Sequence, residues 1–154
     1  MPLLGVSELV AWRRRTEPPV FAGGRAELPT AHGPFHAIGY AGDGVEHIAL
    51  VRGVVTGAAD VPVHLHVECL AGDVLGSTRC SCAAQRDAAL AAIDRAGRGV
   101  LVYLRCRQRP GSGLVHALHG CATWTDREEM LAAHILDDLG VRRPPRTCDD
   151  RQSV

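Results

Sequence analysis

The sequence contains no lysine and no asparagine, so all seventeen basic residues are arginines. Without lysine, Schiff-base catalysis and a lysine contact to phosphate are excluded, and any bound anion is held by arginine, histidine or backbone amides. An excess of charge is also lacking, because seventeen acidic residues balance the basic ones. Proteins that bind the nucleic-acid backbone usually carry a basic excess, so we expect no nucleic-acid partner.

Long apolar runs and aromatic residues are scarce as well. Aromatics make up 4% of the 154 residues, and no apolar run approaches the roughly 20 residues needed to cross a bilayer. Residues 1–24 lack the apolar stretch of a signal peptide and carry arginines at 13–15. We therefore expect a cytoplasmic protein with no membrane partner, and the length suits one domain with a substantial core.

Six cysteines are present, and in a reducing compartment clustered cysteines more often bind metal or act in catalysis than form disulfides. Cys69, Cys80 and Cys82 follow the pattern C-x10-C-x-C. Three thiolates can hold a tetrahedral zinc ion at about 2.3 Å and leave one position for water, as catalytic zinc requires. The other cysteines are scattered, and no fourth thiolate is evident among them: Cys106, Cys121 and Cys148.

Other interpretations of this cluster remain open. The three cysteines can be buried or free thiols, or they can form a structural zinc site completed by His66 or another histidine. His66-x-Glu68 followed by cysteines also resembles part of the zinc deaminase signature, but the P-C-x-x-C element is missing and the spacing is too short.

The apolar pattern predicts an α+β fold, with an N-terminal antiparallel β unit followed by an α/β half. Short β runs separated by glycine-rich turns predict an antiparallel meander over residues 25–69. An alanine-rich helix is expected at 83–96 and a buried strand at 100–104. The stretch Thr125-Asp126-Arg127-Glu128 has the form of a capping box, and the helix that it begins should end at Gly140.

The chain divides into three expected parts. Residues 1–24 are an N-terminal appendage with a short helix from Ser7 to Arg15, since prolines and glycines follow it. Residues 25–141 form the folded domain, and residues 142–154 form a disordered tail.

The segment from His66 to Cys82, HVECLAGDVLGSTRCSC, closely resembles the zinc loop of GTP cyclohydrolase II. That family reads H-S-E-C-L-T-G-D, a short spacer and then L-R-C-D-C-G-x-Q. Gln85, the alanine-rich helix and the stretch G-R-G-V-L-V-Y-L-R at 97–105 extend the likeness to most of residues 25–141. The resemblance implies the family's fold, bound Zn²⁺, a homodimer, and conversion of GTP to a diaminopyrimidinone ribosyl phosphate, formate and pyrophosphate in riboflavin synthesis.

The resemblance also implies roles for individual residues. Cys69, Cys80 and Cys82 would hold zinc, whose water attacks an amidine-like carbon, C8 of a purine in the family. Glu68 and Gln85 would lie beside the base. Arg127 falls where the family places an arginine that takes the nucleotidyl group during pyrophosphate release; the alternative is an exposed residue in the first turn of a helix.

Several positions depart from the family pattern. The family's R-V-H-S-E-C is H-L-H-V-E-C at 64–69, and its R-Q-E-G-R-x-I-G-L loop is R-C-R-Q-R-P-G-S-G-L at 105–114, without the glutamate. Asp126 lies one residue too close to Arg127, a rotation of about 100° on a helix, so its alternative role is to favour the helix N-terminus. The family tyrosine proposed as a proton donor has no clear match, although Cys121 or His116 falls nearby.

Whole segments of the family are absent as well. More than ten residues are missing between Leu118 and Thr125, and the T-N-N-P-x-K strand after Val141 is missing too. The zinc loop is thus retained while the contacts to triphosphate and guanine are weakened. We therefore expect a zinc hydrolase of altered substrate in specialised biosynthesis, which opens or closes a C–N bond in a nucleobase, a nucleoside monophosphate or a related nitrogen heterocycle.

Two alternatives stand beside this hypothesis: a non-catalytic, zinc-stabilised homologue or partner subunit, and a true GTP cyclohydrolase II with a triphosphate site built from arginines. The candidate catalytic residues are Arg127, Asp126, Glu68 and His66. The candidate substrate-binding residues are His64, Arg79, Gln85, Arg105, Arg107 and Arg109. The candidate acid–base groups are the histidines His64, His66, His116 and His119, each of which has an alternative role as a surface or core residue.

Overall fold

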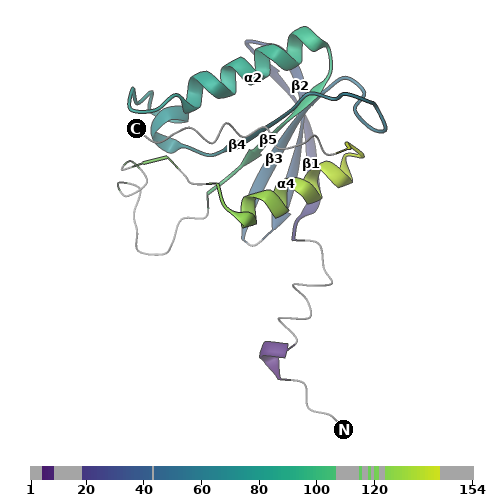
Figure 1. Ribbon diagram of the computed structural model, residues 1–154, viewed down its shortest axis with the longest axis vertical. Coiled ribbons are helices and arrows are strands. Elements are labelled where there is room, and N and C mark those ends of the chain that lie inside the picture. The colour runs from purple at the N-terminus through teal and green to yellow at the C-terminus, as the bar shows by residue number, and fades with distance from the viewer. Residues whose placement is uncertain are drawn as a thin grey trace.

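The computed structural model describes residues 5–8, 19–42, 44–106, 115, 118, 120–121 and 124–142. They form a five-stranded sheet with the strand order β1-β2-β3-β5-β4, and the helices α2 and α4 cover its two faces (Figure 1). The elements are β1 (Phe21–Thr30), β2 (Gly33–Gly42), β3 (Val45–Arg52), β4 (Val63–Val67), a turn of π-helix η1 (Leu70–Val74), α2 (Cys82–Ala96), β5 (Gly99–Leu104) and α4 (Asp126–Asp138). The expected α+β class is confirmed.

The strand β4 departs from the expected meander. β1, β2 and β3 do form an antiparallel meander, but β4 pairs in parallel with β5, with His66 opposite Tyr103. β5 in turn pairs antiparallel with β3. The helix α2 between β4 and β5 carries the chain back along the sheet, and such a crossover makes neighbouring strands parallel. The prediction of an antiparallel meander through Cys69 is therefore wrong for its last strand.

The strand β5 is buried on both faces, which explains its continuous apolar run. Val102 belongs to the core cluster that contains Ile135 of α4. Leu101 belongs to the cluster that contains Ile93 of α2. Since side chains alternate across a strand, the two helices lie on opposite sides of the sheet.

Both predicted helices are present. α2 ends where Gly97 adopts the left-handed conformation with φ of 70°, which glycine adopts without steric cost. α4 begins with the predicted capping box, in which Thr125 accepts a hydrogen bond from Arg127 N–H and Glu128 reaches back to the N-cap backbone. Among the described residues, no helix has the length and apolar character needed to span a bilayer.

The edge strand β1 includes residues 21–24, which the sequence pattern assigns to the appendage. The glycines expected to break structure lie instead where the pairing with β2 shifts register, between Ala22 and Arg25. An edge strand tolerates such a bulge because only one side of it is paired. The expected helix from Ser7 to Arg15 lies mostly outside the described residues, as does nearly all of the expected tail.

Candidate metal centre

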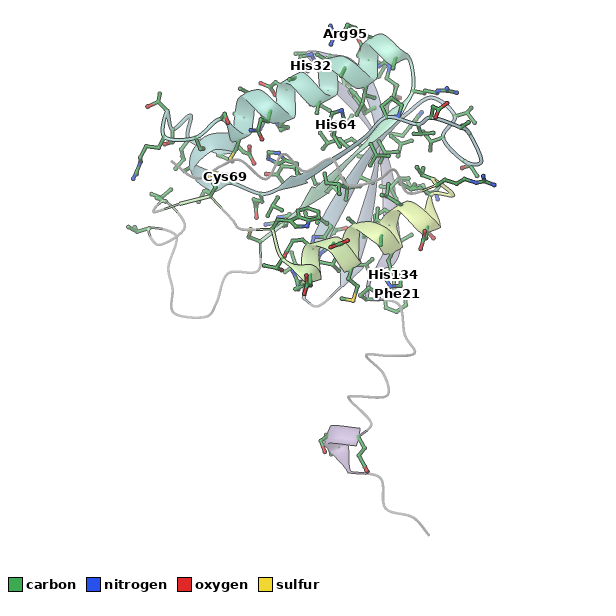
Figure 2. All side chains as sticks on the ribbon, viewed as in Figure 1. Phe21, His32, His64, Cys69, Arg95 and His134 are labelled. Atoms are coloured by element: carbon green, nitrogen blue, oxygen red, sulfur yellow. The ribbon has the colours of Figure 1, made fainter. Side chains whose placement is uncertain are left out.

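The three predicted zinc cysteines meet at the carboxyl end of β4. Cys69 follows this strand, Cys80 precedes α2, and Cys82 is the first residue of that helix. Figure 2 shows Cys69 at the end of the sheet where α2 begins. The Sγ atoms of these residues and of Cys121 all lie within 4.8 Å of one another, so the local spacing does bring the predicted ligands together.

Cys121 adds a sulfur that the spacing did not predict. Its Sγ lies 3.4 Å from that of Cys82 and 3.9 Å from that of Cys69, although 39 and 52 residues separate them along the chain. The expectation that no fourth thiolate is evident is therefore wrong. The sequence offered one sign of this fourth sulfur, namely that Cys121 falls near the position of the missing family tyrosine. The spacing rules for zinc motifs do not detect a cysteine so far along the chain.

The donor set fits a zinc ion. Sulfurs at about 2.3 Å from a tetrahedral zinc lie about 3.8 Å from one another. The Sγ–Sγ distances are 3.8 Å for Cys69 and Cys80, 3.9 Å for Cys69 and Cys121, and 3.4 Å for Cys82 and Cys121. Thiolates are the soft ligands that zinc accepts in structural and catalytic sites, so this group of residues can hold the ion.

Gly72 leaves the space that the sulfurs occupy. A Cβ atom at this position would lie 2.7 Å from Cys80 Sγ and 3.5 Å from Cys69 Sγ. The Gly72 backbone N–H also donates to Cys69 Sγ over 3.4 Å. The loop between the first two cysteines therefore folds over the sulfurs at a residue without a side chain.

The sulfurs differ in their electrostatic surroundings. Burial, followed by the neighbouring sulfurs, raises the pKa of Cys82 well above its usual range, and burial raises the pKa of Cys121 to about 11. A hydrogen bond from the backbone of Cys82 lowers the pKa of Cys80. A divalent cation among these groups would favour their thiolate forms, since a metal deprotonates a coordinating thiol.

His66, a predicted catalytic residue, is held by Asp73. Its Nε2 lies 2.9 Å from Asp73 Oδ2, and its ring stacks on Tyr103 with centroids 5.2 Å apart. The Asp73 side chain is 1% exposed and accepts a hydrogen bond from the Cys69 backbone N–H over 2.9 Å. His66 is thus linked through Asp73 to the backbone of Cys69.

Glu68 and Arg105, both predicted, meet at the ends of the parallel strands β4 and β5. Arg105 Nε lies 3.4 Å from Glu68 Oε1, and the Cys106 backbone N–H donates to Glu68 Oε2 over 3.1 Å. Burial raises the pKa of Cys106 to about 11, with Glu68 and Glu128 adding to the rise while Arg127 opposes it. The charge of Arg127, in the first turn of α4, therefore acts near Glu68.

The remaining predicted residues are more dispersed. His64 lies on the side of the sheet that α2 covers (Figure 2), and burial lowers its pKa. Gln85 is exposed on α2 and donates from Nε2 to Ser81 Oγ, while Arg79 donates to the Leu118 carbonyl. Asp126 is exposed at the start of α4. Other predicted residues lie outside the described part of the chain: Arg107, Arg109, His116 and His119.

The sequence model of the GTP cyclohydrolase II family matches residues 22–144. The chain therefore belongs to the GTP cyclohydrolase II family. This match includes the five strands and both helices apart from the first residue of β1.

Curated relatives carry the name riboflavin biosynthesis protein RibBA. The protein of Nocardia farcinica is 43% identical over 143 residues, which are 92% of this chain and 34% of the relative. That of Rhodococcus erythropolis is 47% identical over 164 residues, 92% of this chain and 39% of the relative. The chain thus spans between 34% and 39% of these relatives. The second alignment is longer than the chain's 154 residues, so the relative carries residues that this chain lacks.

A solved structure has the same fold. The two-domain 3,4-dihydroxy-2-butanone 4-phosphate synthase RibBX from A. baumannii superposes with a TM-score of 0.51 at 22% sequence identity. The match covers 91% of this chain and 39% of that one. At this identity the likeness concerns the fold alone.

Proposed function

We propose that the chain is a zinc-dependent GTP cyclohydrolase II, which opens the imidazole ring of GTP and releases formate and pyrophosphate. The observation that carries the proposal is the cysteine cluster at the carboxyl ends of β4 and β5, beside Glu68 and Arg105. Ligand sites of sheets with parallel strands commonly lie at the carboxyl ends of those strands. Family membership adds the reaction type, and the names of the relatives point to riboflavin synthesis.

The chain's own residues would divide the work. Cys69, Cys80 and Cys82 would hold the ion. When bound, zinc acts as a Lewis acid and lowers the pKa of water, which favours hydrolysis near neutral pH. Glu68 would hydrogen-bond the edge of the base, because Arg105 and the Cys106 amide each contact one of its carboxylate oxygens and both oxygens can accept a further hydrogen bond.

The arginines would bind the phosphates. Arg79 and Arg105 are exposed residues next in sequence to Cys80 and Cys106, and Arg127 lies in the first turn of α4, close enough to influence Cys106. Guanidinium groups bind phosphate oxygens in bidentate fashion. Arg127 would take the role that the family gives to its nucleotidyl-accepting arginine.

The relatives favour GTP over the altered substrate predicted from the departures, since they are named for riboflavin biosynthesis. One experiment distinguishes GTP from an altered substrate. The zinc-loaded chain is incubated with GTP, GMP or guanosine, and formate and pyrophosphate are quantified. Formate and pyrophosphate from GTP, lost in Cys80→Ser, support the proposal. Formate from GMP or guanosine but not from GTP overturns it in favour of an altered substrate.

A second candidate function is favoured by the fourth sulfur. With Cys121 bound, the ion would have four protein ligands, as in structural zinc sites. A non-catalytic, zinc-stabilised homologue would then unfold at higher urea concentration with zinc than without it. It would release no formate from any of the three substrates, whether or not Cys121 is replaced.

The proposal includes the homodimer of the family. β1 is an exposed edge strand of ten residues, on which Phe21 is 55% and Leu28 is 42% exposed. Unpaired edge strands are surfaces on which a second chain can pair. Sedimentation analysis should give twice the chain mass of 16.4 kDa, and a monomer at micromolar concentration would contradict this part of the proposal.

A further inference from the structure

We infer that Cys121 is a fourth zinc ligand, which closes the metal site at rest and has to leave it before hydrolysis. The role of Cys121 as a ligand depends only on the cysteine cluster. Its departure before hydrolysis rests on the proposed function, because a closed metal site affects a reaction only if the chain catalyses one. The family resemblance implies three cysteine ligands and a water, so a fourth thiolate is a property of this chain.

The sulfur geometry supports the fourth ligand. Cys121 Sγ lies 3.9 Å from Cys69 Sγ and 3.4 Å from Cys82 Sγ, and the edge of a ZnS₄ tetrahedron is about 3.8 Å. The distance between Cys69 and Cys80, two ligands carried by the family motif, is 3.8 Å. Cys121 is therefore as well placed toward the motif cysteines as they are toward one another.

Cys106 is nearer in sequence to Cys82 than Cys121 is, but it does not join the sulfur cluster. It lies two residues after the last residue of β5, and its Sγ contacts the Glu68 carbonyl oxygen at 3.4 Å. Within the described residues it does not belong to the group of sulfurs that lie within 4.8 Å of one another. Cys106 is thus a matched control: a half-buried cysteine beside the metal site that should not bind the ion.

The four sulfurs are not held equally. Cys69 and Cys82 are buried, with 3% and 7% exposure, and Cys82 is fixed on the first turn of α2. Cys121 is exposed. Two described contacts join its segment to the loop between Cys69 and Cys80. Half-buried Leu118 packs against the cluster of Cys69, Ala71 and Cys82, and Arg79 Nη2 donates an exposed hydrogen bond to the Leu118 carbonyl oxygen over 3.3 Å. Cys121 is therefore the ligand that can leave with least disturbance of the core.

A closed site has a direct consequence for activity. Four thiolates fill a tetrahedral zinc site, whereas hydrolytic zinc keeps one position for solvent. Removing the Cys121 thiol leaves the three motif cysteines in place and opens that position. Cys121→Ala should therefore release formate from GTP faster than the native chain, while it binds zinc more weakly.

The test uses the full chain in three forms: native, Cys121→Ala and Cys106→Ala. Each is loaded with Zn²⁺, alkylated and mapped by mass spectrometry, and each is separately loaded with Co²⁺ for absorption spectroscopy. In the native chain zinc should protect Cys121 together with Cys69, Cys80 and Cys82. The sulfur-to-cobalt charge-transfer absorbance should fall by about one quarter in Cys121→Ala, because one of four thiolates is lost, and should not change in Cys106→Ala.

The outcomes are distinguishable. If zinc leaves Cys121 of the native chain as reactive as it is without metal, the fourth ligand is overturned, and this measurement needs no variant to fold. If the spectra assign Cys121 as a ligand but neither chain releases formate, the proposed function fails and the fourth ligand stands. If the native chain releases formate and Cys121→Ala is no faster, the closing role is overturned.

Discussion

The Tyr103 hydroxyl donates a hydrogen bond to Asp73 Oδ2 over 2.9 Å, and this bond ties β5 to the turn η1, whose N-cap is Cys69. The same carboxylate receives the Cys69 backbone N–H and contacts His66 Nε2. Buried polar groups are costly unless they are paired. Arg86 Nη1 lies 3.7 Å from the other carboxylate oxygen, so this buried side chain pairs with four groups, and the position of Cys69 depends on it.

Asp73→Asn should weaken zinc binding and stability together. The amide keeps the shape but loses the negative charge that faces Arg86, and it presents an NH₂ group in place of one of the two accepting oxygens. We expect a loss of about 1–3 kcal/mol in the free energy of unfolding and a loss of about 10–100-fold in zinc affinity. Urea unfolding and competition with a zinc indicator measure the two effects. Asp87→Asn, at a 52% exposed side chain, is the control, and equal effects in both variants would contradict the prediction.

Gly72→Ala should disturb the metal site through contact alone. The added methyl would meet Cys80 Sγ at 2.7 Å and Cys82 Cβ at 3.2 Å. Overpacking of this kind costs about 1–3 kcal/mol, and we expect zinc affinity to fall by at least about tenfold, as for other groups that position ligands. Gly24→Ala, where nothing lies within 4 Å of the added Cβ, should bind zinc like the native chain. Native affinity in Gly72→Ala would show that the loop does not fold over the sulfurs.

Tyr40 should make the free energy of unfolding fall as the pH rises into the alkaline range. Its hydroxyl donates to Asp138 Oδ2 over 2.8 Å, and burial, followed by this hydrogen bond, raises its pKa well above the ordinary value of 10.0. Above about pH 10 the unfolded chain loses this proton while the folded chain keeps it, so the free energy of unfolding falls as pH rises.

Tyr40→Phe tests this dependence. The variant should be less stable than the native chain by about 0.5–1.5 kcal/mol at pH 8, because the buried hydrogen bond is lost. The difference should shrink between pH 9 and 11, since the native chain alone loses the contribution of this tyrosine. Urea unfolding at each pH measures it, and a constant difference over this range would refute the assignment.

Thr125→Ala should destabilise the first turn of α4. Thr125 accepts a hydrogen bond from the Arg127 backbone N–H and forms a capping box with Glu128. Loss of such an N-cap costs about 0.5–2 kcal/mol. Thr78→Ala, at an exposed residue outside the helices, is the matched control. If the proposed role of Arg127 is correct, Thr125→Ala should also slow pyrophosphate release from GTP.

Local patterns account for the elements that the sequence predicted well. α2 and α4 follow from an alanine-rich run, an apolar stripe and a capping box, all of which act within a few residues. The spacing of Cys69, Cys80 and Cys82 acts over fourteen residues, and it brought these sulfurs together. The strand order did not follow in the same way, because the partner of β4 depends on the crossover through α2.

By itself the sequence determined the α+β class, the family and the three motif cysteines, because each of these depends on residues close together in the chain. The tertiary structure alone decided that β4 lies parallel to β5, that Glu68 meets Arg105, and that Cys121 joins the sulfurs. The physical reason is the separation along the chain between the residues that determine each feature. Helix caps and loop ligands are set by nearby backbone geometry, whereas Cys121 lies 39 residues from Cys82 and meets it only in the tertiary fold.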